Sequence, residues 1–202
     1  MSSFTWLHLS DLHMGMGGQS PLWPMFKHVL YADLRKMFDK TGPWDAVLFT
    51  GDLTQKGSFE EFDQLSRALE ELWVQLAELG CSPVLLPIPG NHDLQRPDRK
   101  KKPATLLLKQ WWNTPEVREE LWENSRSLYR HTVNDAFANY SKWLERLDGR
   151  IKLPRGIRRG MLPGDLSASL ETRAGLVGIV GLNSAWLPGS LPRRFGQTPS
   201  QC

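Results

Sequence analysis

The stretch Val84-Leu85-Leu86-Pro87-Ile88-Pro89-Gly90-Asn91-His92-Asp93 joins an apolar run to a short polar motif. Residues 84–88 have the length and the apolar character of a buried strand. An amide, an imidazole and a carboxylate follow directly, so these side chains would leave the end of that strand together. Two earlier stretches share the arrangement: an apolar run at 4–9 precedes Asp11-Leu12-His13, and a run at 46–50 precedes Gly51-Asp52.

Helical patterns separate these three runs. Apolar residues recur at helical spacing within residues 21–40, and Ser58 with Glu61 resembles a capping box that opens a helix ending near Leu79. Strands that alternate with helices pair in parallel, and such sheets bind ligands beyond the carboxyl ends of their strands. We therefore predict an α/β fold in which three strand ends meet at one crevice, with the first strand buried on both faces.

The polar residues at these strand ends are candidate metal ligands. Carboxylate, amide and imidazole groups suit Mn, Fe, Zn or Mg. In an extended chain, residues two apart point the same way, so Asp11 and His13 could hold one ion together. Asp52 has two carboxylate oxygens and could bridge two ions about 3.5–4 Å apart.

Three motifs resemble the first three signature motifs of the calcineurin-like metallophosphoesterases, in the family's order: Leu9-Ser10-Asp11-Leu12-His13, Thr50-Gly51-Asp52-Leu53 and Pro89-Gly90-Asn91-His92-Asp93. The resemblance is strong in the first half of the chain and weaker up to about Ala185. It implies a β-sandwich flanked by helices. It also implies hydrolysis of phosphoesters, with a preference for phosphodiesters, by water that two divalent ions (Mn, Fe, Zn or Mg) activate.

The resemblance also implies a role for each motif residue. Asp11, His13, Asp52 and Asn91 correspond to metal ligands. His92 corresponds to the residue that protonates the leaving group or stabilises the transition state, and Asp93 to the carboxylate that orients its imidazole. The residues that bind substrate are not identified by these motifs.

Two later histidine motifs of the family have no counterpart, because the last histidine is His131. We therefore expect a C-terminally incomplete fold. One ion, with Asp11, His13 and Asp52, should bind well, and a second, with Asp52 and Asn91, should bind weakly. The chain would be either a truncated, low-activity form of a longer enzyme or a short relative in which water, a partner domain or chain, or another ligand completes the site.

The rest of the chain predicts further elements around this site. Residues 106–112, 116–129 and 132–147 are predicted as helices of an insertion spanning about 103–148. Residues 165–172 and 176–183 are predicted as a hairpin, so that the metallophosphoesterase domain spans 1–186 and 187–202 form an irregular tail. Five basic residues within 96–102 are either a solvated loop or a rim that steers phosphorylated or polynucleotide substrates.

Composition sets the broad class. A chain of 202 residues with 40% hydrophobic and 23% charged residues is typical of one globular domain, and a net charge of +3 is too mild to indicate nucleic acid by itself. Cys81 and Cys202 lie far apart, which favours reduced thiols and a cytoplasmic setting. We see no secretory signal and no run of about 18 apolar residues, so we expect no membrane span.

Two other readings stay open. The first is a non-catalytic metal- or partner-binding module of a larger effector assembly, in which the tryptophan-rich helices would bind the partner. The second is a metal-dependent nuclease, because the opening motif, continued through Met14-Gly15, also resembles DNA-repair nucleases of the same superfamily.

Overall fold

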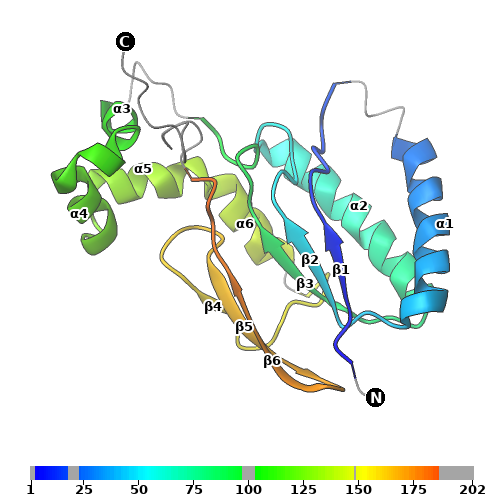
Figure 1. Cartoon of the computed structure of the whole chain (residues 1–202). Coiled ribbons are helices and arrows are strands. Elements are labelled where there is room, and N and C mark those ends of the chain that lie inside the picture. Colours follow the sequence, from blue (N-terminus) through cyan, green and yellow to red (C-terminus); the bar gives the residue numbers. More distant parts are fainter. Residues whose placement is uncertain (1–2, 18–22, 97–102, 148, 187–202) are drawn as a thin grey trace, which may run out of the picture.

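Three parallel strands form the first sheet. The computed structural model describes residues 3–17, 23–96, 103–147 and 149–186, without the side chains of residues 23–25. The strands β1 (Trp6–Leu9), β2 (Ala46–Thr50) and β3 (Val84–Ile88) lie in the order β1-β2-β3. Helix α1 (Trp23–Thr41) connects β1 to β2, and α2 (Phe59–Glu78) connects β2 to β3. Figure 1 shows both helices on the same face of the sheet.

A second, antiparallel sheet contains β4 (Arg158–Arg159), β5 (Leu166–Thr172) and β6 (Gly175–Gly181). The β5–β6 pair is the predicted hairpin. Along the sequence, a helical segment separates the strands of the two sheets. It consists of α3 (Pro103–Leu108), the short 3-10 helix η1 (Trp111–Asn113), α4 (Pro115–Glu123), α5 (Leu128–Ala136) and α6 (Ala138–Leu147). The predicted class, an α/β fold of the calcineurin-like type, is confirmed.

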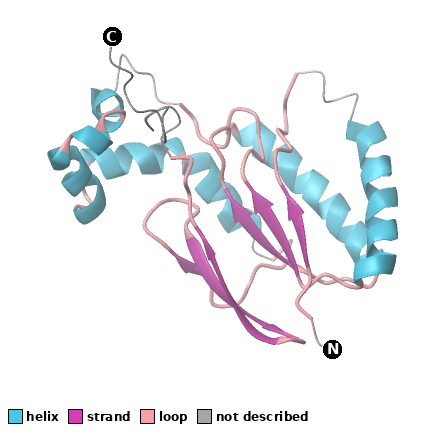
Figure 2. Ribbon diagram, in the orientation of Figure 1, coloured by secondary structure: helices cyan, strands magenta, loops and turns pink. Residues whose placement is uncertain are grey.

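The side chains of β2, the central strand of the first sheet, point alternately to its two faces and divide the core into two layers. Val47 and Phe49 of β2 face the helices, where they join a cluster with residues of α2 and α6. Ala46 and Leu48, on the opposite face, pack with Leu166 of β5 in the space between the sheets. Successive strand residues point to opposite faces, so one short apolar strand serves both layers. Figure 2 shows the resulting order of helices, first sheet and second sheet.

The capping box that opens α2 is present as predicted. The Ser58 hydroxyl accepts a hydrogen bond from the Glu61 backbone N–H at 3.2 Å, and the Glu61 carboxylate accepts one from the Ser58 N–H at 3.1 Å. Gly80, with a φ of +78°, follows the last turn in the left-handed conformation that glycine accepts readily.

The prediction that β1 is buried on both faces is wrong. Within the described residues β1 pairs only with β2 and forms an edge of its sheet. Leu7 and Leu9 pack against the helix-side core, whereas Trp6 is 53% exposed on the other face. The apolar run at residues 4–9 did not show that β1 is an edge strand. A strand buried on one face and a strand buried on both faces need the same residue types at alternate positions.

The bounds of three predicted helices are also wrong. The helix expected over 116–129 ends at Glu123, and the chain restarts at Leu128 with Ser127 as the N-cap of α5. The buried Arg130 guanidinium donates to the carbonyls of Leu121 and Trp122, which satisfies the end of α4. The helix expected over 132–147 is interrupted at Phe137, which separates α5 from α6. The one expected over 106–112 begins earlier, and α3 ends at Leu108.

Two sequence predictions fall on residues outside the described ranges. Most of the basic segment, residues 97–102, and the predicted tail, residues 187–202, are among them. The predicted limits of the domain and of the helical insertion stay predictions. None of the described helices combines the length and the apolar character needed to cross a bilayer.

Replacing Tyr140 by Phe should change how stability depends on pH. The Tyr140 hydroxyl donates to the Pro87 carbonyl at 2.9 Å, and burial, reinforced by the charge of Asp93, raises its pKa above the ordinary value of 10.0. Above about pH 10 the unfolded chain releases this proton while the folded protein retains it, so the free energy of unfolding falls as pH rises. Tyr140→Phe should cost about 1 kcal/mol near neutral pH and should flatten this alkaline fall.

Urea unfolding at about pH 8 and about pH 11 measures both effects. Tyr129→Phe is the matched control, because it removes a phenol hydroxyl elsewhere and leaves Tyr140 in place. An alkaline loss of stability as steep in Tyr140→Phe as in the unaltered protein would contradict the prediction.

Candidate metal centre

The loops that follow β1 and β2 are hydrogen-bonded to each other. The backbone N–H of Asp11 donates to the Gly51 carbonyl at 3.1 Å, and that of His13 donates to the Asp52 carbonyl at 2.9 Å. Met14 N–H donates to the Leu53 carbonyl at 3.0 Å, which continues the ladder beyond the strands. The two loops therefore hold each other in register at the carboxyl edge of the sheet.

Three of the predicted ligands have an unusual backbone conformation. Asp11, His13 and Asp52 have φ values of +56°, +48° and +51°, and no other non-glycine residue in the described ranges has a positive φ. The left-handed region costs a non-glycine residue about 1–3 kcal/mol, and Asp and His tolerate it better than most. The expectation that the chain is extended from Asp11 to His13 is therefore wrong, because both residues turn. The two side chains nevertheless lie close, with 3.9 Å between Asp11 Oδ1 and His13 Nε2.

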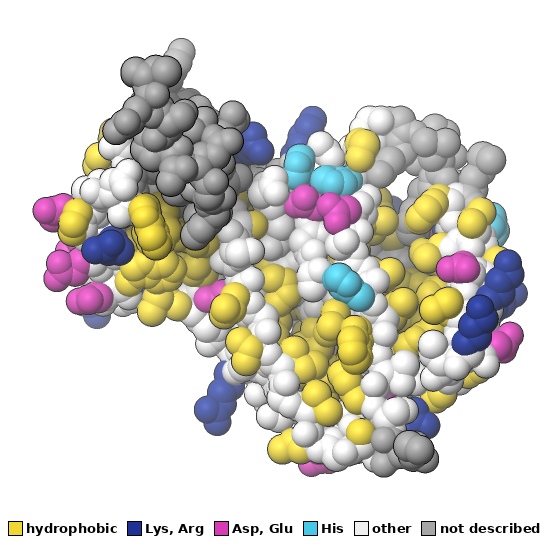
Figure 3. Space-filling view, in the orientation of Figure 1, with side chains coloured by type: hydrophobic (Ala, Val, Ile, Leu, Met, Phe, Trp, Pro, Cys, Tyr) yellow, Lys and Arg dark blue, Asp and Glu magenta, His cyan; other side chains and the backbone are white. Residues whose placement is uncertain are grey.

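These turns bring donor atoms from three loops together. One ligand atom each from His13, Asp52 and His92 lie within 4.8 Å of one another. The His13 and His92 rings meet edge to face, with centroids 4.8 Å apart. His13 Nε2 is 4.0 Å from Asp52 Oδ2 and 3.9 Å from Asp11 Oδ1. Figure 3 shows histidine and acidic side chains gathered beyond the strand ends.

The members of this group differ in exposure. The side chains of His13 and Asp52 are only 20% and 18% exposed, whereas that of Asp11 is 66% exposed. Asp11 thus lies at the open side of the group, outside the close trio. Asn91 is half-buried beside His92 in the loop after β3. A cation could be approached from the side of Asp11 and held by the less exposed residues.

The imidazole of His92 is oriented by the backbone of the β2 loop. Its Nδ1 lies 2.9 Å from the Gln55 carbonyl oxygen, and its backbone N–H donates to Asp52 Oδ1 at 3.0 Å. A carbonyl oxygen can only accept, so Nδ1 carries the proton in this contact. Nε2 is left as the nitrogen that can bind a metal ion or exchange a proton.

Asp93 does not orient His92 by a direct hydrogen bond among the described contacts. Its carboxylate is fully buried and accepts four hydrogen bonds: from the backbone N–H groups of Gly90, Leu53 and Thr54 and from the Thr54 hydroxyl, at 2.7–3.1 Å. Burial raises the pKa of Asp93, while these donors oppose the rise. The carboxylate therefore fixes the β2 and β3 loops, and through them the positions of Asp52 and His92.

The comparisons with known proteins agree with this geometry. The family model described as calcineurin-like phosphoesterase matches residues 4–168. The chain belongs to the calcineurin-like phosphoesterase family. Its metallophosphoesterase domain implies a metal-dependent phosphoester hydrolase in general terms, and members of the family bind divalent metals. The search of curated proteins found no match.

The residues of this phosphoesterase fit a divalent cation. The Nε2 atom of His13 lies 3.9 Å from Asp11 Oδ1 and 4.0 Å from Asp52 Oδ2, so one ion between them could contact all three groups. Imidazole nitrogens and carboxylate oxygens together suit Mn, Fe or Zn. Asp11 and Asp52 place two carboxylates beside the His13 imidazole. One ion would balance this charge.

The sequence did not reveal that Glu61 and the peptide group between Gln55 and Lys56 support His92. The Glu61 carboxylate accepts from the Lys56 N–H at 2.8 Å, and the same peptide group presents the Gln55 carbonyl to His92. Glu61 is only 7% exposed. The capping-box pattern identified Glu61 as a helix cap, but no local signal shows that the capped loop carries the acceptor for an imidazole 37 residues away in sequence.

Gly90→Ala should weaken metal binding. A Cβ atom at Gly90 would overlap the backbone nitrogen and the Oδ1 atom of Asp52, so Asp52 would have to move. We expect at least a tenfold loss of Mn²⁺ affinity by calorimetry and a cost of about 1–3 kcal/mol in stability. Gly178→Ala in β6 is the matched control, because a Cβ there would meet nothing within 4 Å. Equal Mn²⁺ affinities in the two variants would disprove the assignment of Asp52 as a ligand.

Proposed function

We propose that this chain hydrolyses phosphodiesters with a divalent ion such as Mn²⁺. The observation that supports this best is the convergence of His13, Asp52 and His92 donor atoms within 4.8 Å in a member of a phosphoesterase family. A bound ion would polarise a phosphoryl oxygen and make a water molecule acidic enough to supply the attacking hydroxide. The side chains of the loops after β1, β2 and β3 would hold the ion and protonate the leaving oxygen.

His13 and Asp52 hold the ion in this proposal, and Asp11 and Asn91 complete the set from the open side. Asp93 holds the loops that carry Asp52 and His92. The described residues offer this donor set for one ion, so we propose that a second ion binds weakly and that turnover is slow. Two-metal sites stabilise both the attacking and the leaving oxygen, and a single ion serves only part of that task.

His92 is proposed to protonate the leaving oxygen at Nε2. The Gln55 carbonyl accepts from Nδ1–H in both the neutral and the charged form of the ring, so proton exchange is confined to Nε2. This contact also keeps the imidazole from rotating, which holds Nε2 toward the group formed with His13 and Asp52. A positioned general acid of this kind typically contributes about 10²–10⁴-fold to the rate.

Asp52→Ala and His92→Ala should each reduce Mn²⁺-dependent hydrolysis of bis-p-nitrophenyl phosphate by at least about 100-fold. Asp52→Ala should also lose Mn²⁺ affinity in calorimetry, because it removes a ligand. The controls are Asp63→Ala and His131→Ala, which remove the same groups on α2 and α5. Turnover that is unchanged in both site variants would rule out the proposed function.

Measuring both Mn²⁺ binding and diester hydrolysis distinguishes an enzyme from a non-catalytic module. Stoichiometric binding without hydrolysis of any diester would favour the module, which could serve a larger effector assembly. Nucleotides and nucleic acids are among the candidate diesters, and the exposed Arg155 and Arg158 offer positive charge at the second sheet. A salt-sensitive gel shift with single-stranded and duplex DNA would favour a nuclease.

A further inference from the structure

The carbonyl that accepts from His92 belongs to a peptide group whose other end is also held. The Gln55 carbonyl oxygen lies 2.9 Å from His92 Nδ1, and the Lys56 N–H of the same peptide donates to the Glu61 carboxylate at 2.8 Å. The N–H and the carbonyl of a trans peptide point in opposite directions, because the group is planar and rigid. A partner that fixes the Lys56 N–H therefore also fixes the direction of the Gln55 carbonyl.

The Glu61 carboxylate does more than cap α2. A capping box needs only the bond from the Ser58 N–H, at 3.1 Å, whereas the shorter bond comes from Lys56, which lies outside the box. Both N–H groups donate to the same oxygen, Oε2. The carboxylate is thus shared between the start of the helix and the peptide that faces His92.

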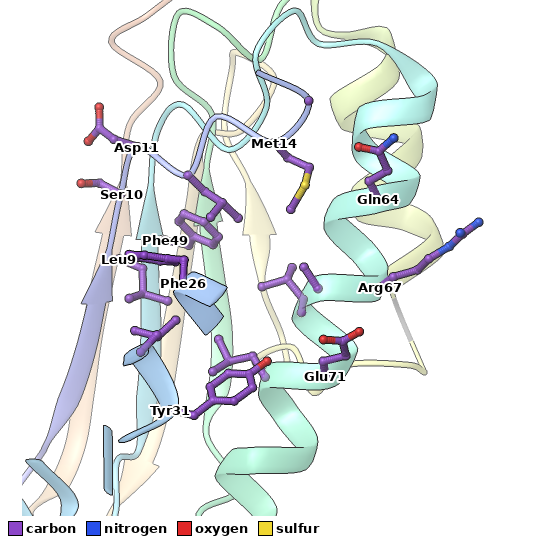
Figure 4. Close-up of a pocket in the computed structure, with 16 residues that line it drawn as sticks. Leu9, Ser10, Asp11, Met14, Phe26, Tyr31, Phe49, Gln64, Arg67 and Glu71 are labelled. Carbon is purple, nitrogen blue, oxygen red and sulfur yellow. The ribbon is translucent and has the colours of Figure 1, made fainter. Parts of the chain in front are cut away.

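Glu61 is itself held on both sides. Its side chain is only 7% exposed, and its neighbour Phe62 is fully buried in the core between α2 and the first sheet. A Cβ atom at Gly15, in the loop after β1, would come within 2.6 Å of Glu61 Cγ, so the side chain packs against that backbone. Figure 4 shows this loop beside the N-terminal half of α2, with Met14 directed toward the helix. The carboxylate therefore has little freedom to turn away from Lys56.

The β2 loop has other hydrogen bonds, but they hold other peptide groups. The Thr54 N–H and hydroxyl donate to Asp93 at 2.7 and 2.8 Å, and the Gly57 carbonyl accepts from the Asn139 side chain at 2.9 Å. Neither interaction includes the peptide between Gln55 and Lys56. Among the described contacts, the bond to Glu61 is the one that fixes the plane of that peptide.

We propose that Glu61 is a positioning residue, which acts through the peptide between Gln55 and Lys56 to hold His92 with its proton on Nδ1 and with Nε2 free. An imidazole released from the carbonyl could carry its proton on either nitrogen and could rotate, so Nε2 would face the metal centre for only part of the time. The effect of Glu61 on turnover rests on the proposed function, whereas the tautomer of His92 is a property of the resting protein.

Long-range ¹H–¹⁵N NMR of the metal-free chain tests this at about pH 8, above the range in which histidine ordinarily titrates. The His92 signals are assigned by their loss in His92→Ala. We expect the Nδ1–H form in the unaltered protein and a shift toward the Nε2–H form in Glu61→Ala, because a free neutral imidazole carries its proton mainly on Nε2. Glu61→Gln should keep the Nδ1–H form, since its amide oxygen can accept from the same two N–H groups.

Ser58→Ala is the matched control. It removes the hydroxyl that caps α2 and leaves the bond between Lys56 and Glu61, so it should lower the urea midpoint without changing the His92 tautomer. In Mn²⁺-dependent hydrolysis of bis-p-nitrophenyl phosphate, Glu61→Ala should lower kcat at least about tenfold with little change in KM. Glu61→Gln should retain most of the rate.

Three NMR results would overturn the proposal: an Nε2–H form of His92 in the unaltered chain, an Nδ1–H form in Glu61→Ala, or an equal shift in Ser58→Ala. If Glu61→Ala does not fold, Glu61→Asp decides the question, because its carboxylate is one methylene shorter and would not reach the Lys56 N–H. A complete lack of turnover in the unaltered chain would refute the proposed hydrolysis, and the tautomer of His92 would still test the role of Glu61.

Discussion

The buried carboxylate of Asp93 is the constraint on which the functional edge of this molecule depends. A charged group without exposure to water is costly unless donors surround it, and here four donors from two loops do so. The loop after β2 and the loop after β3 therefore cannot move apart without leaving a buried charge unpaired. This interaction sets the distance between Asp52 and His92 before any ion or substrate binds.

The backbone of the first loop adds a second constraint. Asp11, His13 and Asp52 adopt left-handed conformations that would not persist in isolation, and the hydrogen bonds between the β1 and β2 loops hold them there. The strained residues are also the ones that present the candidate ligands. Strain at such positions is consistent with a site whose geometry is fixed in advance, so that little free energy is lost when a ligand orders it.

Much of this arrangement could be predicted from local patterns. The three apolar runs, the parallel pairing, the capping box at Ser58 and the hairpin after Asp165 follow from periodicity and short motifs, and the motifs placed Asp52 and His92 at neighbouring strand ends. Other features depend on residues distant in sequence. The turn at His13, the Gln55 carbonyl that orients His92 and the exposure of Trp6 have no local signal. The sequence analysis missed the break between α4 and α5, where Ser127 caps α5 and the Arg130 guanidinium donates to the carbonyls at the end of α4.

We propose that His13 and Asp52 share one cation. Pulsed electron paramagnetic resonance of the chain with one equivalent of Mn²⁺ tests it most directly, because coupling to an imidazole nitrogen modulates the Mn²⁺ echo. We expect nitrogen modulation that weakens or disappears in His13→Ala. Bound Mn²⁺ with no nitrogen modulation, or with modulation unaffected by His13→Ala, would contradict it.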